Sequence, residues 1–239
     1  MGDHRAFGVV LLYSVLATTP VSSFASVDFI ADDGDANTSS GPSFDGTDYL
    51  WGSYFTASDP TAIDEVSVAF GRVDAGTAVT LLVYDDPDGD FDPRNATLVG
   101  SLSGVSGFSN AENPLPDTFT SYSFPIGGEP VVSGGFYVAA FISGVDGVTA
   151  APTQTFGEAP ARRDFQTATN QGFSFFGPEG ESDLTDLSSF PVFQPVGDPT
   201  IFGSLAGNIL VRARGTVIPE PTSLAMVSVG GLFLLRRRR

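Results

Sequence analysis

Between residues 26 and 217 the chain consists of short runs in which apolar and polar residues alternate, separated by glycine, proline, aspartate and asparagine. A period of two is typical of β-strands, because successive side chains on a strand point to opposite faces of the sheet. The clearest runs lie at 66–70, 78–84, 97–103, 118–124, 136–142 and 209–214. No long window in this region has the 3.6-residue spacing of an amphipathic helix. We therefore expect residues 26–217 to form a single all-β domain, a β-sandwich or jelly-roll-like fold.

Aromatic residues leave two interpretations open. Between Thr149 and Thr200, phenylalanines recur among prolines and long strand runs are few, which favours long loops held by buried rings over an aromatic binding face. Tyr49 and Trp51 fall on the same side of an alternating run and form a candidate stacking platform for sugar rings. The other interpretation, which we favour, places both rings in the core.

Missing residue types exclude much of catalytic chemistry. The chain has no cysteine and no lysine, and its single histidine, His4, lies in an N-terminal segment that we expect to be removed. Disulfides, thiolate metal sites, Ser-His-Asp triads and Schiff-base lysines are therefore excluded from the mature chain. We expect no enzymatic activity. The alternative is an extracellular carbohydrate-binding or carbohydrate-active protein that uses two paired carboxylates.

The charge of the chain is strongly one-sided. Residues 26–221 contain 27 acidic residues and six arginines, a net charge of −21. This balance argues against nucleic-acid binding, which depends on basic side chains at the phosphates. The adjacent pair Arg162 and Arg163 is expected at the surface, as an ion-pair site.

Residues 1–25 have the three regions of a secretory signal peptide, in the expected order. Arg5 supplies the positive charge, Val9 to Ala17 form a nine-residue apolar run, and a polar segment with a proline follows. The small residues Ser23 and Ala25 occupy positions −3 and −1, which predicts export by the Sec machinery and cleavage after Ala25. The alternatives are an uncleaved anchor and a buried N-terminal strand.

Residues 218–239 carry a second set of export features. A Pro-Glu-Pro motif precedes the apolar segment 222–235, and an arginine cluster follows; these residues are Pro219, Glu220 and Pro221, then Arg236, Arg237, Arg238 and Arg239. As a helix, the 14 apolar residues reach about 21 Å, short of the ~30 Å hydrocarbon core of a bilayer. We expect a transmembrane-type helix in which the arginines extend to cytoplasmic headgroups and act as a membrane stop. The alternative is a buried apolar strand with a basic tail.

The order of motif, short apolar helix and arginine cluster resembles the PEP-CTERM sorting signal of exported bacterial proteins. In that family a membrane-embedded exosortase processes the tail, and the protein reaches the cell surface or the extracellular matrix. The resemblance implies an exosortase-type partner and transient anchoring in the inner membrane. Separately, we expect the exported β domain to have a structural or adhesive role, with extracellular polysaccharide as a further partner. The usual core is Val-Pro-Glu-Pro, and Ile218 replaces the valine here. Because the resemblance is confined to residues 218–239, it implies a destination and nothing about the exported domain.

The densest charge lies at residues 85–92, where four aspartates alternate. Calcium takes six to eight oxygen ligands, and carboxylates close together in a turn supply several of them. The candidate calcium ligands are Asp86, Asp88, Asp90 and Asp92. The loop is no EF-hand, because Phe91 and Thr97 occupy the positions of the required glycine and glutamate. The alternative is a solvated acidic hairpin loop, and residues 32–37 form a second, weaker calcium candidate.

Overall fold

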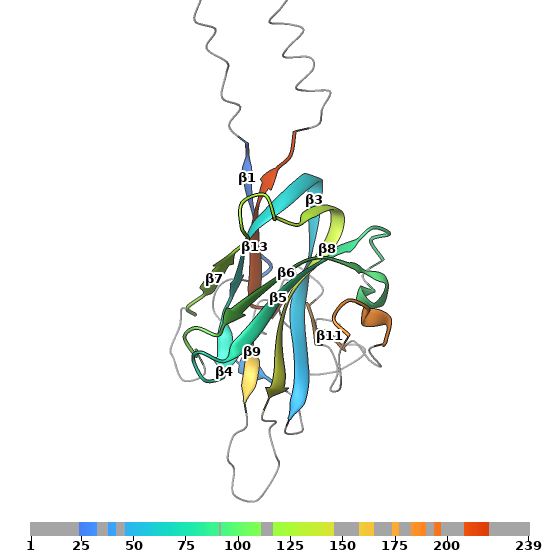
Figure 1. The fold of residues 1–239 in the computed structure, drawn as a ribbon. Helices are drawn as coiled ribbons and strands as arrows, with labels where there is room; N and C mark the ends of the chain where they lie inside the picture. The colour runs from blue at the N-terminus through green and yellow to red at the C-terminus, as the bar shows by residue number, and fades with distance from the viewer. Residues whose placement is uncertain are drawn as a thin grey trace, which may run out of the picture.

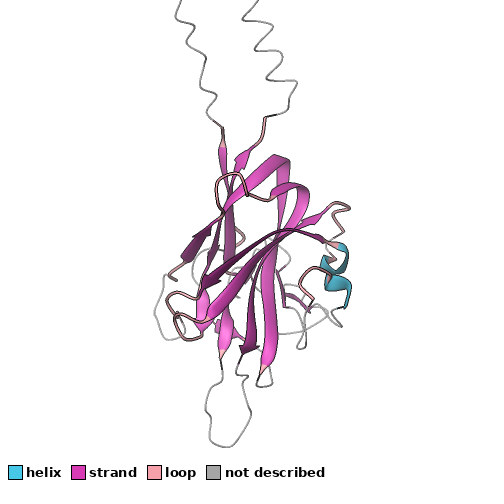
Figure 2. Ribbon diagram, viewed as in Figure 1, coloured by secondary structure: helices cyan, strands magenta, loops and turns pink. Residues whose placement is uncertain are grey.

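The computed structural model describes residues 24–32, 38–41, 46–90, 92–110, 117–145, 158–164, 174–176, 183–189, 194–196 and 208–219. These residues form antiparallel β-sheets and two single-turn 3₁₀ helices, with no α-helix among them (Figures 1 and 2). The all-β class predicted from the sequence is therefore confirmed.

The strands of the first sheet contain most of the described residues. They are β1 (Ser26–Phe29), β3 (Thr47–Val68), β5 (Ala78–Asp86), β6 (Thr97–Val105), β7 (Thr120–Ser123), β8 (Val131–Val145), β10 (Ser174–Phe176), β11 (Gln194–Val196) and β13 (Val211–Val217). The main order is β1-β13-β3-β8-β5-β6; β7 and β10 also pair with β3, and β11 pairs with β10.

A smaller sheet has the order β12-β9-β2, with β4 paired to β9. Its strands are β2 (Thr38–Ser40), β4 (Phe70–Arg72), β9 (Ala159–Asp164) and β12 (Asn208–Ile209), and the 3₁₀ helices are η1 (Pro93–Asn95) and η2 (Leu187–Ser189). Three strands, β9, β10 and β11, therefore fall in the part of the chain that the sequence led us to expect as long loops. Of the phenylalanines expected to hold those loops, Phe175 and Phe176 lie in β10, and the others lie outside the described residues.

The large sheet folds back on itself around β3. In a flat sheet β1 and β8 are about 14 Å apart, since three strand spacings of ~4.8 Å separate them. Instead, Phe29 of β1 meets Phe136 of β8 with ring centroids 4.9 Å apart. The β3–β8 register shifts between Ala57 and Thr61, where the β3 sequence contains Pro60. Two arms of the sheet thus face each other across one hydrophobic core, which is consistent with the predicted β-sandwich.

All six predicted runs lie in or overlap strands, but the longest strands exceed them. β3 has 22 residues and β8 has 15, whereas the sequence runs have five to seven. The difference arises where glycine and polar residues continue a strand. Gly52, for example, lies inside β3 because a Cβ there would overlap the carbonyl oxygen of Val138 on β8. Close backbone approach, rather than a turn, explains this glycine.

A second hydrophobic cluster covers the other face of the β3–β8–β5 region. It contains Leu50, Tyr54, Tyr84 and Tyr137, and Leu187 of η2 is buried against it. The Tyr84 hydroxyl donates a hydrogen bond to the Leu184 carbonyl oxygen at 2.9 Å. The segment that contains η2 therefore covers this face, next to the loop in which the aspartates lie.

Candidate functional site

The loop between β5 and β6 brings three of the predicted calcium ligands together. Carboxylate oxygens of Asp86, Asp88 and Asp90 all lie within 4.8 Å of one another. Asp86 is the last residue of β5, and Gly89 adopts a φ of 66° that allows the chain to turn between the other two. Two oxygens bound to one calcium at 2.3–2.6 Å are at most about 5 Å apart, so the three side chains are spaced as ligands of a single ion.

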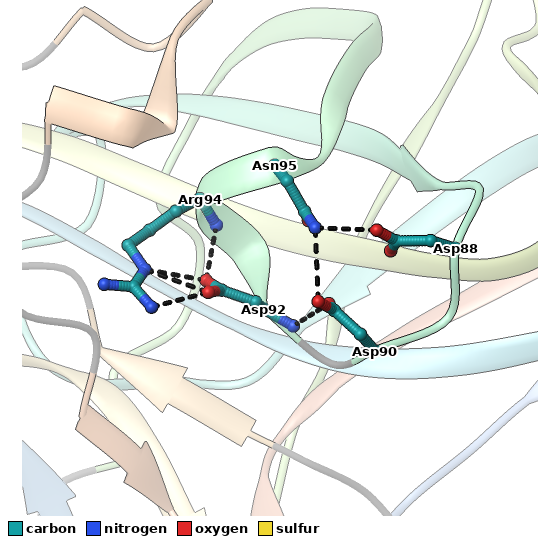
Figure 3. Close-up of polar contacts among 5 residues, drawn as sticks. All are labelled: Asp88, Asp90, Asp92, Arg94 and Asn95. Atoms are coloured by element: carbon teal, nitrogen blue, oxygen red, sulfur yellow. Dashed lines mark hydrogen bonds and ion pairs between the residues drawn. The ribbon is translucent and has the colours of Figure 1, made fainter.

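Asn95 of η1 is a fourth member of this cluster that the sequence analysis missed. Its amide nitrogen donates to Asp88 at 3.0 Å and to Asp90 at 3.3 Å (Figure 3). The amide therefore supplies partial positive charge at the exposed side of the cluster. The sequence signal for it is weak, because Asn95 lies seven residues after Asp88 and outside the alternating aspartates.

Asp92, the fourth predicted ligand, points to a different partner. Its carboxylate accepts hydrogen bonds from the backbone nitrogen of Arg94 at 3.0 Å and from that guanidinium at 2.5 Å (Figure 3). The Asp92 side chain thereby caps η1. The side-chain hydrogen bonds from Arg94 lower the pKa of Asp92. Of the four predicted ligands, three therefore lie together, and Asp92 caps η1 instead.

Asp86 differs from its two neighbours because it is fully buried, whereas Asp88 and Asp90 are exposed. The rings of Tyr54 and Tyr137 lie 5.0 Å apart in the second cluster. Burial first, and then the negative charge of Asp86, raise the pKa of both tyrosines, so both hydroxyls keep their protons. Gly135 is required here because a Cβ at this position would overlap the Tyr54 hydroxyl. A buried carboxylate is costly in free energy unless hydrogen bonds or a cation compensate it.

Tyr49 and Trp51 belong to the core, as the favoured interpretation held. Their exposed fractions are 5% and 0%, and their rings stack with centroids 5.6 Å apart. Both lie on the same face of β3, as the alternation predicts, but that face is the inner one. A sugar ring has no access to either side chain in this fold.

Arg162 and Arg163 are also buried, which corrects the expectation of a surface ion-pair site. Arg162 donates to Asp117 at 2.7 Å, and the two side chains are only 6% and 1% exposed. Arg163 is 7% exposed, and burial lowers its pKa. The pairing partner is 45 residues away in the sequence, so no local pattern identifies it. This pair is part of the fold and lies away from solvent.

The two ends of the described domain lie side by side at one end of the sheet (Figure 1). Ser26 of β1 pairs with Thr216 of β13, and the Val217 nitrogen donates to the Ala25 carbonyl oxygen at 2.9 Å. The Ile218 nitrogen donates to Pro60 at 2.8 Å, and the described chain ends at Pro219.

Most of the two predicted export segments lies outside the described residues. This applies to residues 1–23, to Glu220 and Pro221, to the apolar segment 222–235 and to the arginines at 236–239. Within the described ranges, no helix is long and apolar enough to cross a membrane. Of the second acidic candidate, only Asp32 is described, and it forms an ion pair with Arg212 at 2.5 Å.

A shallow groove lies on the β1–β13–β3–β7 side of the domain. Its volume is about 220 Å³, and its walls carry charged, hydroxyl and aromatic side chains, among them Asp28, Glu65, Ser67, Phe119, Arg212 and Arg214. The Arg212 guanidinium lies over the Phe119 ring, 3.8 Å from its centroid, and Arg214 donates to Asp28 at 2.8 Å. The groove is thus lined by planar polar groups next to one aromatic ring.

No protein-family model matches this chain, and no curated protein matches it. Among solved structures, it is similar to the cysteine protease and lectin-like domains of Cwp84, a surface layer associated protein of Clostridium difficile. The sequence identity is 14% and the TM-score is 0.38. The match covers 72% of this chain and 32% of that one, so this chain spans about a third of the structure it matches.

Proposed function

We propose that this chain is an exported bacterial protein of the cell surface or extracellular matrix, with a structural or adhesive role. Its β domain, residues 26–217, is carried there by the signal peptide 1–25 and by a PEP-CTERM-type sorting signal at 218–239. The observation that carries the proposal is the position of the two chain ends. β1 begins and β13 ends next to each other, so two export segments leave the domain on the same side.

This geometry suits a domain that folds while it is attached to a membrane. Before processing, the proposed precursor is held by an apolar segment at each end. A domain whose two ends lie on opposite sides needs a long linker if both of its apolar segments are to reach the same membrane. Here the last strand pair brings Ala25 and Val217 within one hydrogen bond, so no linker is required.

The sorting motif also begins where backbone pairing stops. Ile218 makes the last backbone hydrogen bond of the described chain, and Pro219 and Pro221 have no N–H group with which to continue a ladder. Residues preceding a proline favour extended conformations, so Glu220 is expected in an extended segment outside the folded strand. A processing enzyme of the exosortase type can reach such a segment without unfolding β13.

Calcium is the proposed ligand of Asp86, Asp88 and Asp90. The support is their spacing, the full burial of Asp86 and the adjacent amide of Asn95. A 180° turn of that amide exchanges its nitrogen for its oxygen and offers a further hard oxygen ligand. A bound cation would fix the β5–η1 turn next to η2, which η1 contacts. The role of the ion is therefore structural.

The sorting motif is tested by replacing Pro219, Glu220 and Pro221 with alanine in the native host. The expected result is a precursor that stays in the inner-membrane fraction, whereas the parent reaches the surface. The chain offers a matched control in its other Pro-x-Pro sequence, residues 114–116, whose replacement by alanine should leave sorting unchanged. Normal maturation of the 219–221 variant would exclude the motif as the recognition element.

Carbohydrate binding is a second candidate function, and the groove on the β1–β13–β3–β7 side favours it. Charged planar side chains, hydroxyls and an aromatic ring are the groups that bind sugar hydroxyls and ring faces. Phe119→Ala and Ser67→Ala are expected to weaken retardation of the protein in gels that contain the polysaccharide of its host. Equal migration of parent and variants, with and without the polysaccharide, would reject this function.

A further inference from the structure

The end of the domain from which the chain leaves is a row of four strands. Consecutive register partners run across it: Ser26 of β1, Thr216 of β13, Ala62 of β3 and Val131 of β8. At ~4.8 Å per strand spacing, this row spans no more than about 14 Å. Both export segments begin at this row, which forms one pole of the molecule (Figure 1).

Exposed apolar side chains are concentrated beyond the row. Eight large apolar side chains are exposed among the described residues, and four of them lie at or next to this row: Phe24, Ile126, Val131 and Ile218. Phe24 precedes the predicted cleavage site, so the mature chain keeps three of the four. Pro60 lies next to Ile218, because its carbonyl oxygen accepts a hydrogen bond from the Ile218 nitrogen at 2.8 Å.

Ile126 is the most exposed of these side chains and is held at the tip of a fixed turn. Its exposed fraction is 101%. The turn is closed by the Gly128 nitrogen, which donates to Pro125 at 2.9 Å, and by the Gly127 nitrogen, which donates to the Glu129 carboxylate at 2.7 Å. The Ile63 nitrogen donates to Pro130 at 2.8 Å, which fixes the turn to β3. These contacts hold an aliphatic side chain in water, which suggests that it packs against a surface outside the domain.

The length of chain beyond the domain identifies that surface. Only residues 219–221 separate Ile218 from the apolar segment that begins at Thr222. At 3.3–3.6 Å per residue, this connection spans at most about 14 Å. If residues 222–235 are embedded in a bilayer, as the proposed function requires, the row of four strands faces the membrane at close range.

We propose that this pole of the domain rests on the membrane surface, with Ile126 and Ile218 inserted among the headgroups of neutral phospholipids. This inference depends on the proposed sorting function. A neutral surface is specified because Asp59 and Glu129 flank the apolar residues and the exported chain carries a net charge of −21. Anionic lipid repels such a domain. The contact holds the acidic β domain upright at the outer face, with the sorting motif next to the bilayer.

The test uses the full chain with one introduced cysteine, which is unique because the parent has none. Ile126→Cys is labelled with the environment-sensitive dye NBD, and the protein is reconstituted into phosphatidylcholine vesicles. Phe108→Cys is the matched control, since this apolar residue is 49% exposed and adjoins Ser109, which bridges to Phe70. Phe70 is eight residues along the chain from Ala62, about 25 Å from the row.

The expected result is a blue shift of NBD emission at position 126 on reconstitution, with quenching by spin-labelled headgroups, and neither change at position 108. Replacing half of the lipid by phosphatidylglycerol should reduce the shift. Vesicles that carry the protein but leave both labels water-like would overturn the membrane contact while the proposed sorting function stands. A full chain that does not float with the vesicles would overturn the proposed anchoring and the contact together.

Discussion

Replacing Asp88 and Asp90 by asparagine should change stability in opposite directions with and without calcium. In a calcium-free buffer the three carboxylates of the cluster repel one another, because their oxygens lie within 4.8 Å. Two unit charges at that distance repel by about 0.9 kcal/mol in the dielectric of water. The double variant removes all three pair repulsions, which amounts to about 2–3 kcal/mol in that dielectric.

For a domain of this size, 1 kcal/mol corresponds to about 2–4 °C in Tm, so the variant should melt up to about 5–10 °C above the parent in chelator. Saturation with calcium reverses the order. At a calcium concentration of 1,000 times Kd, the parent gains about 4.1 kcal/mol, since the ion binds the folded state preferentially, and this gain exceeds the ~2–3 kcal/mol of carboxylate repulsion. The variant has lost two of three carboxylates and should gain nothing beyond the effect of ionic strength.

The assay is thermal unfolding of the full chain in chelator, in calcium and in sodium chloride at matched ionic strength. Asp59→Asn with Asp74→Asn is the control, because it removes the same charge from exposed sites away from the loop. This control should keep the calcium response of the parent. A D88N/D90N protein that melts below the parent in chelator, or equal stabilisation of both proteins by calcium, would contradict a calcium site at these carboxylates.

Three further outcomes follow from the described contacts. The Asp92→Asn variant should keep the full calcium response. Its free energy of unfolding should fall by no more than about 1 kcal/mol, the usual value of an exposed ion pair. Loss of the calcium response in thermal unfolding would show that Asp92 is a ligand. Gly135→Ala should destabilise the domain by about 1–3 kcal/mol in urea unfolding, and Tyr54→Phe should recover part of that loss, because the added Cβ overlaps the Tyr54 hydroxyl; no recovery would contradict the overlap. Stability should fall as the pH rises above 10, because burial raises the pKa of Tyr122 to about 12 and raises that of Tyr84 further. In the unfolded chain these tyrosines lose their protons near pH 10, so rising pH favours unfolding. A Tm that stays constant from pH 9 to 11.5 would contradict this prediction.

The strand pattern was predictable because it is local. Alternation within five to seven residues identified runs such as 78–84 and 97–103, which form the β5–β6 hairpin. The length of β3 was not predictable, since Ser58, Asp59 and Pro60 have the composition of a turn but occupy the bend of a continuous strand. Tertiary packing decides between those outcomes.

The candidate site was predictable in part for the same reason. Asp86, Asp88 and Asp90 come together through one turn, and their alternation is visible in the sequence. Asp92 lies apart from the other three aspartates because Arg94 donates hydrogen bonds to its carboxylate. The spacing of the aspartates in the sequence does not predict these hydrogen bonds.

Long-range partners were not predictable from spacing at all. The burial of Arg162 depends on Asp117, far away in the chain, and a basic pair in an acidic sequence suggests a surface position. Similarly, the alternation predicted that Tyr49 and Trp51 lie on the same face of β3. Whether that face is buried depends on the folding back of the sheet, which the alternation does not reveal.

The central claim, processing at both ends of one exported domain, is tested most directly by intact mass spectrometry of the protein recovered from the surface of its native host. The expected product is a chain that begins at Ser26 and lacks residues 222–239, so that neither apolar segment remains. A surface-exposed chain that still ends in the four arginines, or that retains residues 1–25, would contradict it.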